Sequence, residues 1–297
     1  MDNKYFLYFN NWWNGFFNGI DANNINFFKK LFSLTKYNNF EITNNLDKAN
    51  ILIEAGKPID EIINKKEWIL KINFIGEPVL PDHNKYDIVL TGSTNIPNCI
   101  DLPISVMYTL GNNYFEKINN KNKIINSIPP NFCCFVVSNP NSPSRNKMFD
   151  IINNYKKVNS AGRYKNNTNN SIVHLNWWST EYINYLKTHK FMICFENTKM
   201  ENYSTEKIIN AFLANTIPIY WATHEIKKLF NENALLFLED ESEESFKNLL
   251  DKIIELDNNN EKYLEFINRP RFTDENLKYW EQNYTFNALA NKINLFN

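Results

Sequence analysis

The chain has 297 residues, of which 43% are hydrophobic and 22% charged, and its formal net charge is −1. This length allows two domains with their own hydrophobic cores, and the near-neutral charge argues against nucleic acid as a partner, because phosphate backbones attract basic surfaces. The four cysteines show no metal-ligand spacing, and no basic region precedes an apolar stretch at the N-terminus. These features predict a cytoplasmic protein with reduced thiols and no signal peptide or transmembrane segment.

The first part of the chain alternates short apolar runs with longer amphipathic runs, as the βα units of a parallel sheet do. Strands are expected at 4–9, 49–55, 68–74 and 86–92, with helices at 22–34 and 58–65. Residues 111–131 are rich in Asn and Lys and contain no long apolar run, which predicts a linker. We therefore expect two domains, at 1–115 and 116–297.

A second series of βα units follows the linker. Strands are expected at 132–138, 191–195 and 216–221, with helices at 144–157, 204–214, 243–256 and 274–297. In the first of these helices, Met148, Ile151, Ile152 and Tyr155 recur at helical spacing. No glycine-rich GxGxxG loop is present in the sequence.

Two of the strand–loop–helix units place a cation at the start of the helix, Arg145 in one and Lys207 in the other. A cation is unfavourable there because the helix N-terminus carries partial positive charge, so a bound phosphate or diphosphate would explain both. The alternative is that Ser204 or Thr205 caps the helix and Lys207 extends into water. Both cations follow strands of one predicted parallel sheet, where open α/β folds bind ligands, and this favours the first interpretation.

The segment KFMICFENTKMENYSTEKIINAFLANTIPIYW resembles the donor-binding signature of the α-1,3-fucosyltransferases of glycosyltransferase family 10. FVVSNPNSPSRNKMFDIINNYKKV resembles the second signature of that family. The segments YFLYFNNWWN and WILKINFIGEPVLPDHNKYDIVLTG are similar to the opening strand and to the Gly-Glu strand of the bacterial members. The resemblance covers nearly the whole chain in order, and it is densest in the two donor signatures.

The resemblance implies the α/β fold called GT-B, with two Rossmann-like domains facing across a cleft. Residues 1–115 would bind the acceptor and 116–297 the nucleotide sugar, with the last helix possibly crossing back to the first domain. The implied reaction is an inverting, metal-independent transfer of fucose from GDP-fucose to a hydroxyl of a glycan acceptor, O3 of GlcNAc or glucose. No cofactor is expected, and the oligomeric state is left open.

Glu77 is the residue that the resemblance implies as the catalytic base, because inversion in one displacement needs a base opposite the leaving diphosphate. Gly76 and Pro78 would fix the backbone around its carboxylate. The alternative is an ordinary exposed glutamate in a turn. Trp12 and Trp13 could stack on sugar rings, although burial in the core is an equal possibility for either.

The resemblance also implies the residues that bind the donor. Arg145 and Lys207 would stabilise the charge that develops on the diphosphate, so that no metal is required. Asn197 and Tyr203 would form hydrogen bonds to the phosphates or the fucose, and Glu206 would bind the ribose hydroxyls. We expect these polar groups to gain their partners only when the donor is bound.

Two other functions are compatible with the sequence. The same fold could use another GDP-linked or dTDP-linked 6-deoxy or amino sugar, since Ser204 stands where the family signature has Val. A non-catalytic protein that binds carbohydrate or nucleotide is the second alternative.

Overall fold

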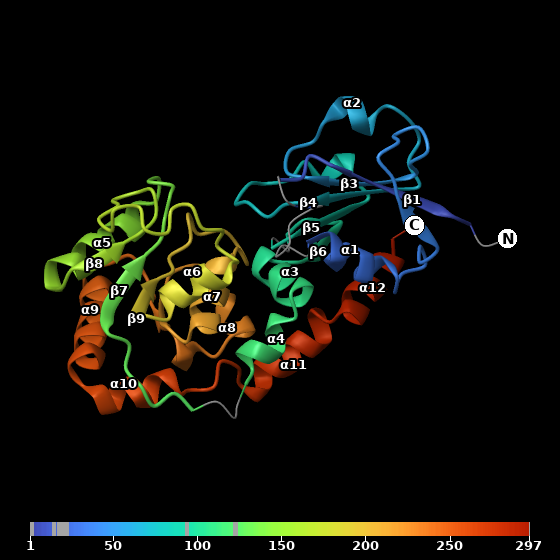
Figure 1. Cartoon of the computed structure of the whole chain (residues 1–297). Helices are drawn as coiled ribbons and strands as arrows, with labels where there is room; N and C mark the ends of the chain where they lie inside the picture. Colours follow the sequence, from blue (N-terminus) through green and yellow to red (C-terminus); the bar gives the residue numbers. More distant parts are fainter. Residues whose placement is uncertain (1–2, 14–15, 17–23, 93–94, 121–123, 297) are drawn as a thin grey trace. The chain divides into compact units, whose positions relative to one another are not determined.

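Figure 1 shows the computed structural model of the chain, which describes residues 3–13, 16, 24–92, 95–120 and 124–296. Contacts divide the chain into two compact units. Unit 1 comprises Met1–Asn113, Met200–Tyr203 and Lys278–Asn297, and unit 2 comprises Tyr114–Lys199 and Ser204–Leu277. Two segments from late in the sequence therefore belong to the unit that the first part of the chain forms.

In the described residues, unit 1 contains a six-stranded parallel sheet in the order β2-β1-β3-β4-β5-β6. The strands are β1 (Tyr5–Asn10), β2 (Phe40–Ile42), β3 (Ile51–Ala55), β4 (Leu70–Phe74), β5 (Ile88–Thr91) and β6 (Cys99–Asp101). The helices of this unit are α1 (Asn24–Phe32), α2 (Asp60–Ile63), α3 (Ile104–Gly111) and α12 (Phe286–Asn294), with a 3-10 turn η1 (His83–Lys85). All five residues of β3 are buried, as in parallel sheets whose two faces are both covered.

A charged side chain is buried inside this apolar sheet, the carboxylate of Glu54 in β3. It accepts hydrogen bonds from the Asn10 amide, from the Tyr86 hydroxyl and from the Ile59 backbone N–H. These donors come from three other parts of unit 1, and they satisfy a group that would be costly to bury alone. Glu54 therefore joins the carboxyl end of β1 to the loop that follows β3.

Unit 2 contains, within the described residues, a five-stranded parallel sheet in the order β11-β10-β9-β7-β8. The strands are β7 (Asn131–Phe135), β8 (Val158–Ser160), β9 (His189–Ile193), β10 (Ile217–Tyr220) and β11 (Leu236–Phe237). The helices are α4 (Tyr114–Ile118), α5 (Pro143–Tyr155), α6 (Thr180–Leu186), α7 (Glu206–Ala214), α8 (Ile226–Leu229), α9 (Glu243–Asn258) and α10 (Asn260–Ile267), with a 3-10 turn η2 (Glu232–Ala234). Helix α11 (Asp274–Asn283) begins in unit 2 and ends in unit 1.

The order of the strands in unit 2 has one reversal. From β7 the chain first adds β8 on one side, and then returns to add β9, β10 and β11 on the other side. Loops that leave β7 and β9 therefore diverge from each other at the carboxyl edge of the sheet. Such a switch point is where open parallel sheets bind their ligands.

The predicted α/β fold with parallel sheets is confirmed, and all predicted strands are present, as β1, β3, β4, β5, β7, β9 and β10. The strands that the sequence missed, β2, β6, β8 and β11, have only two or three residues, too few for a recognisable pattern. Helix α4 lies inside the predicted linker, and the helix predicted at 274–297 is divided into α11 and α12. The division occurs because the Thr285 hydroxyl accepts from Ala288 N and caps α12.

No helix in the described part of the chain is both long enough and apolar enough to cross a bilayer.

Asp257, near the end of α9, is a buried acid with two lysine partners. Its side chain is 1% exposed, and its carboxylate lies 2.8 Å from Lys156 Nζ and 2.9 Å from Lys190 Nζ. Burial alone would raise the pKa of Asp257, but hydrogen bonds from the two lysines lower it. Since Lys190 belongs to β9, this acid attaches α9 to the central strand of the sheet.

We predict that Asp257→Ala lowers the free energy of unfolding by about 3 kcal/mol, because it leaves the nearly buried Lys190 ammonium without its counter-ion. Thermal unfolding near neutral pH measures the effect, and Asp251→Ala, at an exposed acid of the same helix, is the matched control. The folded pKa of Asp257 is lowered, so its contribution is complete above the unfolded value of about 3.9 and disappears as the pH falls through the folded value. Equal unfolding temperatures for the two variants would contradict this role.

Candidate active site

A cavity of about 460 Å³ lies at the switch point of unit 2. It is lined by Val136–Asn139 after β7, by Ala161–Arg163 after β8, and by Asn197 after β9. A Cβ atom on Gly162 would lie 2.2 Å from the carbonyl oxygen of Val137, so only glycine lets the loop after β8 approach the end of β7 so closely. Four of the residues predicted to bind the donor line this one cavity: Arg145, Asn197, Glu206 and Lys207.

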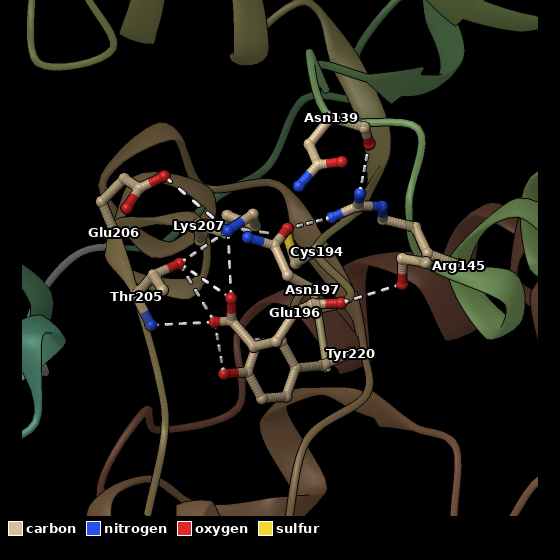
Figure 2. A network of polar contacts seen from close by, with 10 residues as sticks. Asn139, Arg145, Cys194, Glu196, Asn197, Thr205, Glu206, Lys207 and Tyr220 are labelled. Carbon is tan, nitrogen blue, oxygen red and sulfur yellow. Dashed lines mark hydrogen bonds and ion pairs between the residues drawn. The ribbon is translucent and has the colours of Figure 1, made fainter. Parts of the chain in front are cut away.

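Arg145 is fully buried in the first turn of α5. Its guanidinium donates to Asn197 Oδ1 at 2.7 Å and to the backbone oxygen of Asn139 at 2.6 Å (Figure 2). Asn139 follows β7 and Asn197 follows β9, so the guanidinium is held by the loops on both sides of the switch point. A fixed, planar group with five N–H donors suits recognition of phosphate oxygens.

Glu196, which the sequence analysis did not assign to the site, is the central acceptor of the network in Figure 2. It is fully buried directly after the apolar run of β9. Its carboxylate accepts from Thr205 N at 2.8 Å, from Thr205 Oγ1 at 2.9 Å, from Lys207 Nζ at 3.0 Å and from Tyr220 OH at 2.9 Å. One carboxylate thus connects the ends of β9 and β10 with the start of α7.

Lys207 is held in its charged form by these neighbours. Burial alone would lower the pKa of its ammonium, but the carboxylates of Glu196 and Glu206 raise it above its usual value. Glu206 Oε1 lies 3.9 Å from Lys207 Nζ, and the side chain of Lys207 is 15% exposed. The cavity therefore has a cation of fixed position on its wall.

The hydroxyl groups at the N-caps of α5 and α7 both donate to Glu196 instead of capping their helices. Ser142 Oγ donates to the backbone oxygen of Glu196 at 3.3 Å, and Thr205 Oγ1 donates to the carboxylate. In the described residues neither N-cap side chain accepts a hydrogen bond from its own helix. The N-cap hydroxyls therefore do not occupy the backbone N–H groups in the first turns of α5 and α7.

The expectation that the polar groups have partners only when the donor is bound is wrong for Arg145, Asn197 and Lys207. Arg145 donates to Asn197, and Lys207 is paired with Glu196. The physical reason is burial, because a charge removed from water is costly unless it is paired or hydrogen-bonded.

Glu77 and Tyr203 belong to unit 1, where they line a small cavity together with Thr91, Gly92 and Asn202. Glu77 is exposed and lies in a turn closed by a hydrogen bond of 2.8 Å from Val79 N to the Glu77 backbone oxygen. Its role as a base stays a prediction, as do the roles of the donor-binding residues.

Trp12 is part of the core of unit 1. Its indole ring stacks on Phe16, with ring centroids 4.0 Å apart, and on Phe74, with centroids 5.3 Å apart. Its Nε1 donates to the backbone oxygen of Ile53 at 3.0 Å. Trp13 is half-buried like Trp12, and its ring centroid lies 5.7 Å from that of Phe16 and 6.3 Å from that of Phe74. Contact with a sugar therefore stays a prediction for both rings.

Among the residues that the structure describes, no group of three or more His, Cys, Asp or Glu side chains is arranged to hold a metal ion. The charged side chains that line the unit 2 cavity are instead those of Arg145, Arg163, Glu206 and Lys207.

A family model described as "Glycosyltransferase family 10 (fucosyltransferase) C-term" matches residues 129–294, more than half of the chain. The chain is 33% identical over 159 residues to an α-(1,3)-fucosyltransferase of Helicobacter pylori, an alignment that covers 53% of this chain and 31% of that protein. It is 29% identical over 151 residues to the human 4-galactosyl-N-acetylglucosaminide 3-α-L-fucosyltransferase 9, covering 47% of this chain and 42% of the human protein. The chain thus spans less than half the length of these two relatives.

Solved structures share the fold. A crystal structure of an α1,3-fucosyltransferase superposes with a TM-score of 0.74 at 22% identity, covering 98% of this chain and 89% of that one. A crystal structure of an α1,3-fucosyltransferase with GDP-fucose superposes with a TM-score of 0.65 at 21% identity, covering 94% and 90%. The fold class is GT-B, as the sequence predicted.

We predict that Glu196→Gln makes the affinity for GDP depend on pH. Without the Glu196 carboxylate, burial lowers the pKa of the Lys207 ammonium relative to the unchanged protein, so the cation is lost earlier as the pH rises through the alkaline range. In the unchanged protein the pKa of Lys207 is raised, and affinity should vary little over this range. Isothermal titration calorimetry with GDP measures both proteins.

The matched control for this experiment is Glu243→Gln, at a glutamate of unit 2 whose side chain is 86% exposed. This variant should bind GDP as the unchanged protein does at every pH. If Glu196→Gln also behaves like the unchanged protein, Glu196 does not determine the charge of Lys207.

Proposed function

Because the chain belongs to glycosyltransferase family 10 (fucosyltransferase), we propose that it transfers fucose from GDP-fucose to a hydroxyl of a glycan acceptor. We further propose that the reaction inverts the anomeric carbon, requires no metal, and modifies O3 of GlcNAc or glucose. The observation that carries the proposal is the cavity at the unit 2 switch point, where four of the predicted donor-binding residues lie together.

The donor diphosphate fits the chemistry of this cavity. Arg145 supplies a buried guanidinium, Lys207 supplies an ammonium whose charge is maintained by Glu196, and the first turns of α5 and α7 supply backbone N–H groups. Negative charge builds on the diphosphate oxygens as the bond between the sugar and the phosphate breaks. Donors that are already oriented stabilise this charge without further rearrangement.

These cations can fulfil the electrostatic role that a divalent metal has in other nucleotide-sugar enzymes. Two hydrogen-bond donors that are fixed in the protein, Arg145 and Lys207, would face the leaving group directly. Glu206, which also lines the cavity, would accept hydrogen bonds from the ribose hydroxyls. Asn197 holds Arg145 and would in addition contact a phosphate or the fucose.

Glu77 is the proposed base in the single displacement. It takes the proton from the acceptor hydroxyl while the hydroxyl oxygen forms its bond to the anomeric carbon and GDP leaves from the opposite face. The product is a glycoside of inverted configuration and free GDP. The exposure of Glu77 is consistent with a group that must accept a proton from a substrate.

We also propose a cytoplasmic location. The support is that Cys99, Cys133, Cys134 and Cys194 are free thiols and that three of them are buried, as is common in a reducing compartment.

Purified protein incubated with GDP-fucose and an array of oligosaccharide acceptors tests the proposal. Transfer should occur with GDP-fucose, and GDP should raise the thermal unfolding temperature whereas dTDP should not. Stabilisation by dTDP alone would indicate another sugar donor. Binding of GDP-fucose without transfer to any acceptor would indicate a non-catalytic protein.

We predict that Glu77→Ala lowers the rate of transfer by a factor of about 100 to 10,000 while leaving the affinity for GDP unchanged, because it removes only the proton acceptor. Steady-state rates and calorimetry separate the two quantities. Glu61→Ala, at an exposed glutamate of α2 in the same unit, is the control and should have the activity of the unchanged protein. Unaltered turnover by the Glu77 variant would remove this residue from the mechanism.

We predict that Lys207→Ala weakens binding of GDP about tenfold to a hundredfold, because it deletes a charge-assisted hydrogen bond, and that it also slows transfer. Lys228→Ala, at an exposed lysine of α8, is the control. The metal independence is tested in the same assay with a chelator. Loss of activity on chelation, with recovery on adding Mg²⁺ or Mn²⁺, would contradict it.

A further inference from the structure

Four residues in the middle of the donor-binding segment, Met200–Tyr203, belong to unit 1. The residues before and after them, including Glu196, Asn197 and Lys207, belong to unit 2 and form the network of Figure 2. The segment that resembles the donor signature is therefore held by two different sets of contacts. The contacts within unit 1 determine where Tyr203 lies.

The first of these contacts is a close approach of two backbones. A Cβ atom on Gly92, which follows β5, would lie 2.5 Å from the backbone oxygen of Asn202 and 2.9 Å from its carbonyl carbon. Asn202 itself has a φ of 52°, the left-handed conformation that asparagine and aspartate tolerate better than most residues. Both residues are therefore suited to a segment that is pressed against the end of β5.

The second contact is made by Asp101, at the end of β6. Its carboxylate accepts from Asn202 Nδ2 at 2.7 Å and from the hydroxyl of Tyr284. Asn202 is 7% exposed and Tyr284 is fully buried. Burial and the neighbouring Asp101 carboxylate both raise the pKa of Tyr284, so its hydroxyl stays protonated and donates.

The consequence of these contacts is the position of Tyr203. This residue is 8% exposed, and it lines the small cavity of unit 1 that Glu77 also lines. Asn202 is the neighbour of Tyr203 in the chain, so a displacement of Asn202 from Asp101 moves the phenol as well. Tyr284 shares Asp101 but contributes nothing to this cavity.

We propose that Asp101 is a positioning residue, which acts through Asn202 to hold Tyr203 beside Glu77. The proposal rests on the proposed function, because it assumes that Tyr203 contacts the donor phosphates or the fucose. Asp101 is not among the residues that line the small cavity of unit 1 or the unit 2 cavity. Its effect should therefore appear mainly in the affinity for the donor.

The test exchanges the two partners. Asn202→Asp keeps the left-handed backbone but places its carboxylate against that of Asp101. It should raise KM for GDP-fucose and Kd for GDP about tenfold, which is the usual size of the coupling between two groups in contact. The double variant Asp101→Asn with Asn202→Asp restores an amide–carboxylate pair in the reverse sense. It should return both constants to within about threefold of the unchanged protein.

Three further variants separate positioning from folding. Asn202→Gly removes the amide without adding charge and keeps the backbone conformation accessible, so it replaces Asn202→Asp if that variant does not fold. It should raise Kd for GDP in the same direction. Tyr284→Phe removes a further hydrogen bond to Asp101 from a hydroxyl that also interacts with Asn202. It should lower the unfolding temperature and raise KM for GDP-fucose less than Asn202→Asp does. Asn39→Asp, at an exposed residue of unit 1, is the control for adding a carboxylate.

The proposal is overturned if Asn202→Asp and Asn202→Gly bind GDP as tightly as the unchanged protein, or if the double variant folds but does not recover affinity. The affinity for GDP is measured without turnover, so it tests the role of Asp101 even if the protein fails to transfer fucose. In that case the absence of transfer counts against the proposed function, and the binding constants count for or against the role of Asp101.

Discussion

The buried ion pair of Glu196 and Lys207 is the interaction on which the unit 2 cavity depends. Removing these two charges from water costs several kcal/mol for each of them, and the cost is offset only when the geometry and additional hydrogen bonds are good. Glu196 meets this condition with donors from Thr205 and Tyr220 as well as Lys207. The carboxylate therefore determines how the ends of β9 and β10 and the start of α7 lie relative to one another.

The same residue also accepts hydrogen bonds from the hydroxyl groups at the N-caps of α5 and α7. A serine or threonine that caps a helix contributes roughly 1 kcal/mol, and both Ser142 and Thr205 direct their hydroxyls to Glu196 instead. The stability that these caps would contribute is given up at the place where an anion is expected. Because Glu196 and Glu206 lie beside Lys207, the proposed recognition of a diphosphate would depend on the direction of the donors rather than on net charge.

Sequence reasoning found the parts of the site that follow local rules. Apolar runs gave β7 and β9, and the cations after them, Arg145 and Lys207, stood out because the start of a helix is an unfavourable place for positive charge. Glu196 was missed, although a carboxylate directly after a buried strand is a usable signal. Its partner Lys207 is eleven positions further on, and only the fold shows that the two pair.

Local sequence patterns could not predict contacts between residues that are far apart in the chain. Asn202 and Asp101 are 101 positions apart, and no periodicity or turn rule connects them. The stretch from Phe195 to Lys207 is rich in polar side chains, and it is not held as a single loop. Its two ends satisfy the network of Glu196 in unit 2, whereas its centre forms hydrogen bonds to Asp101 in unit 1. A segment with two sets of partners needs polar groups for both, so its composition follows from the division of the fold as well as from the ligand.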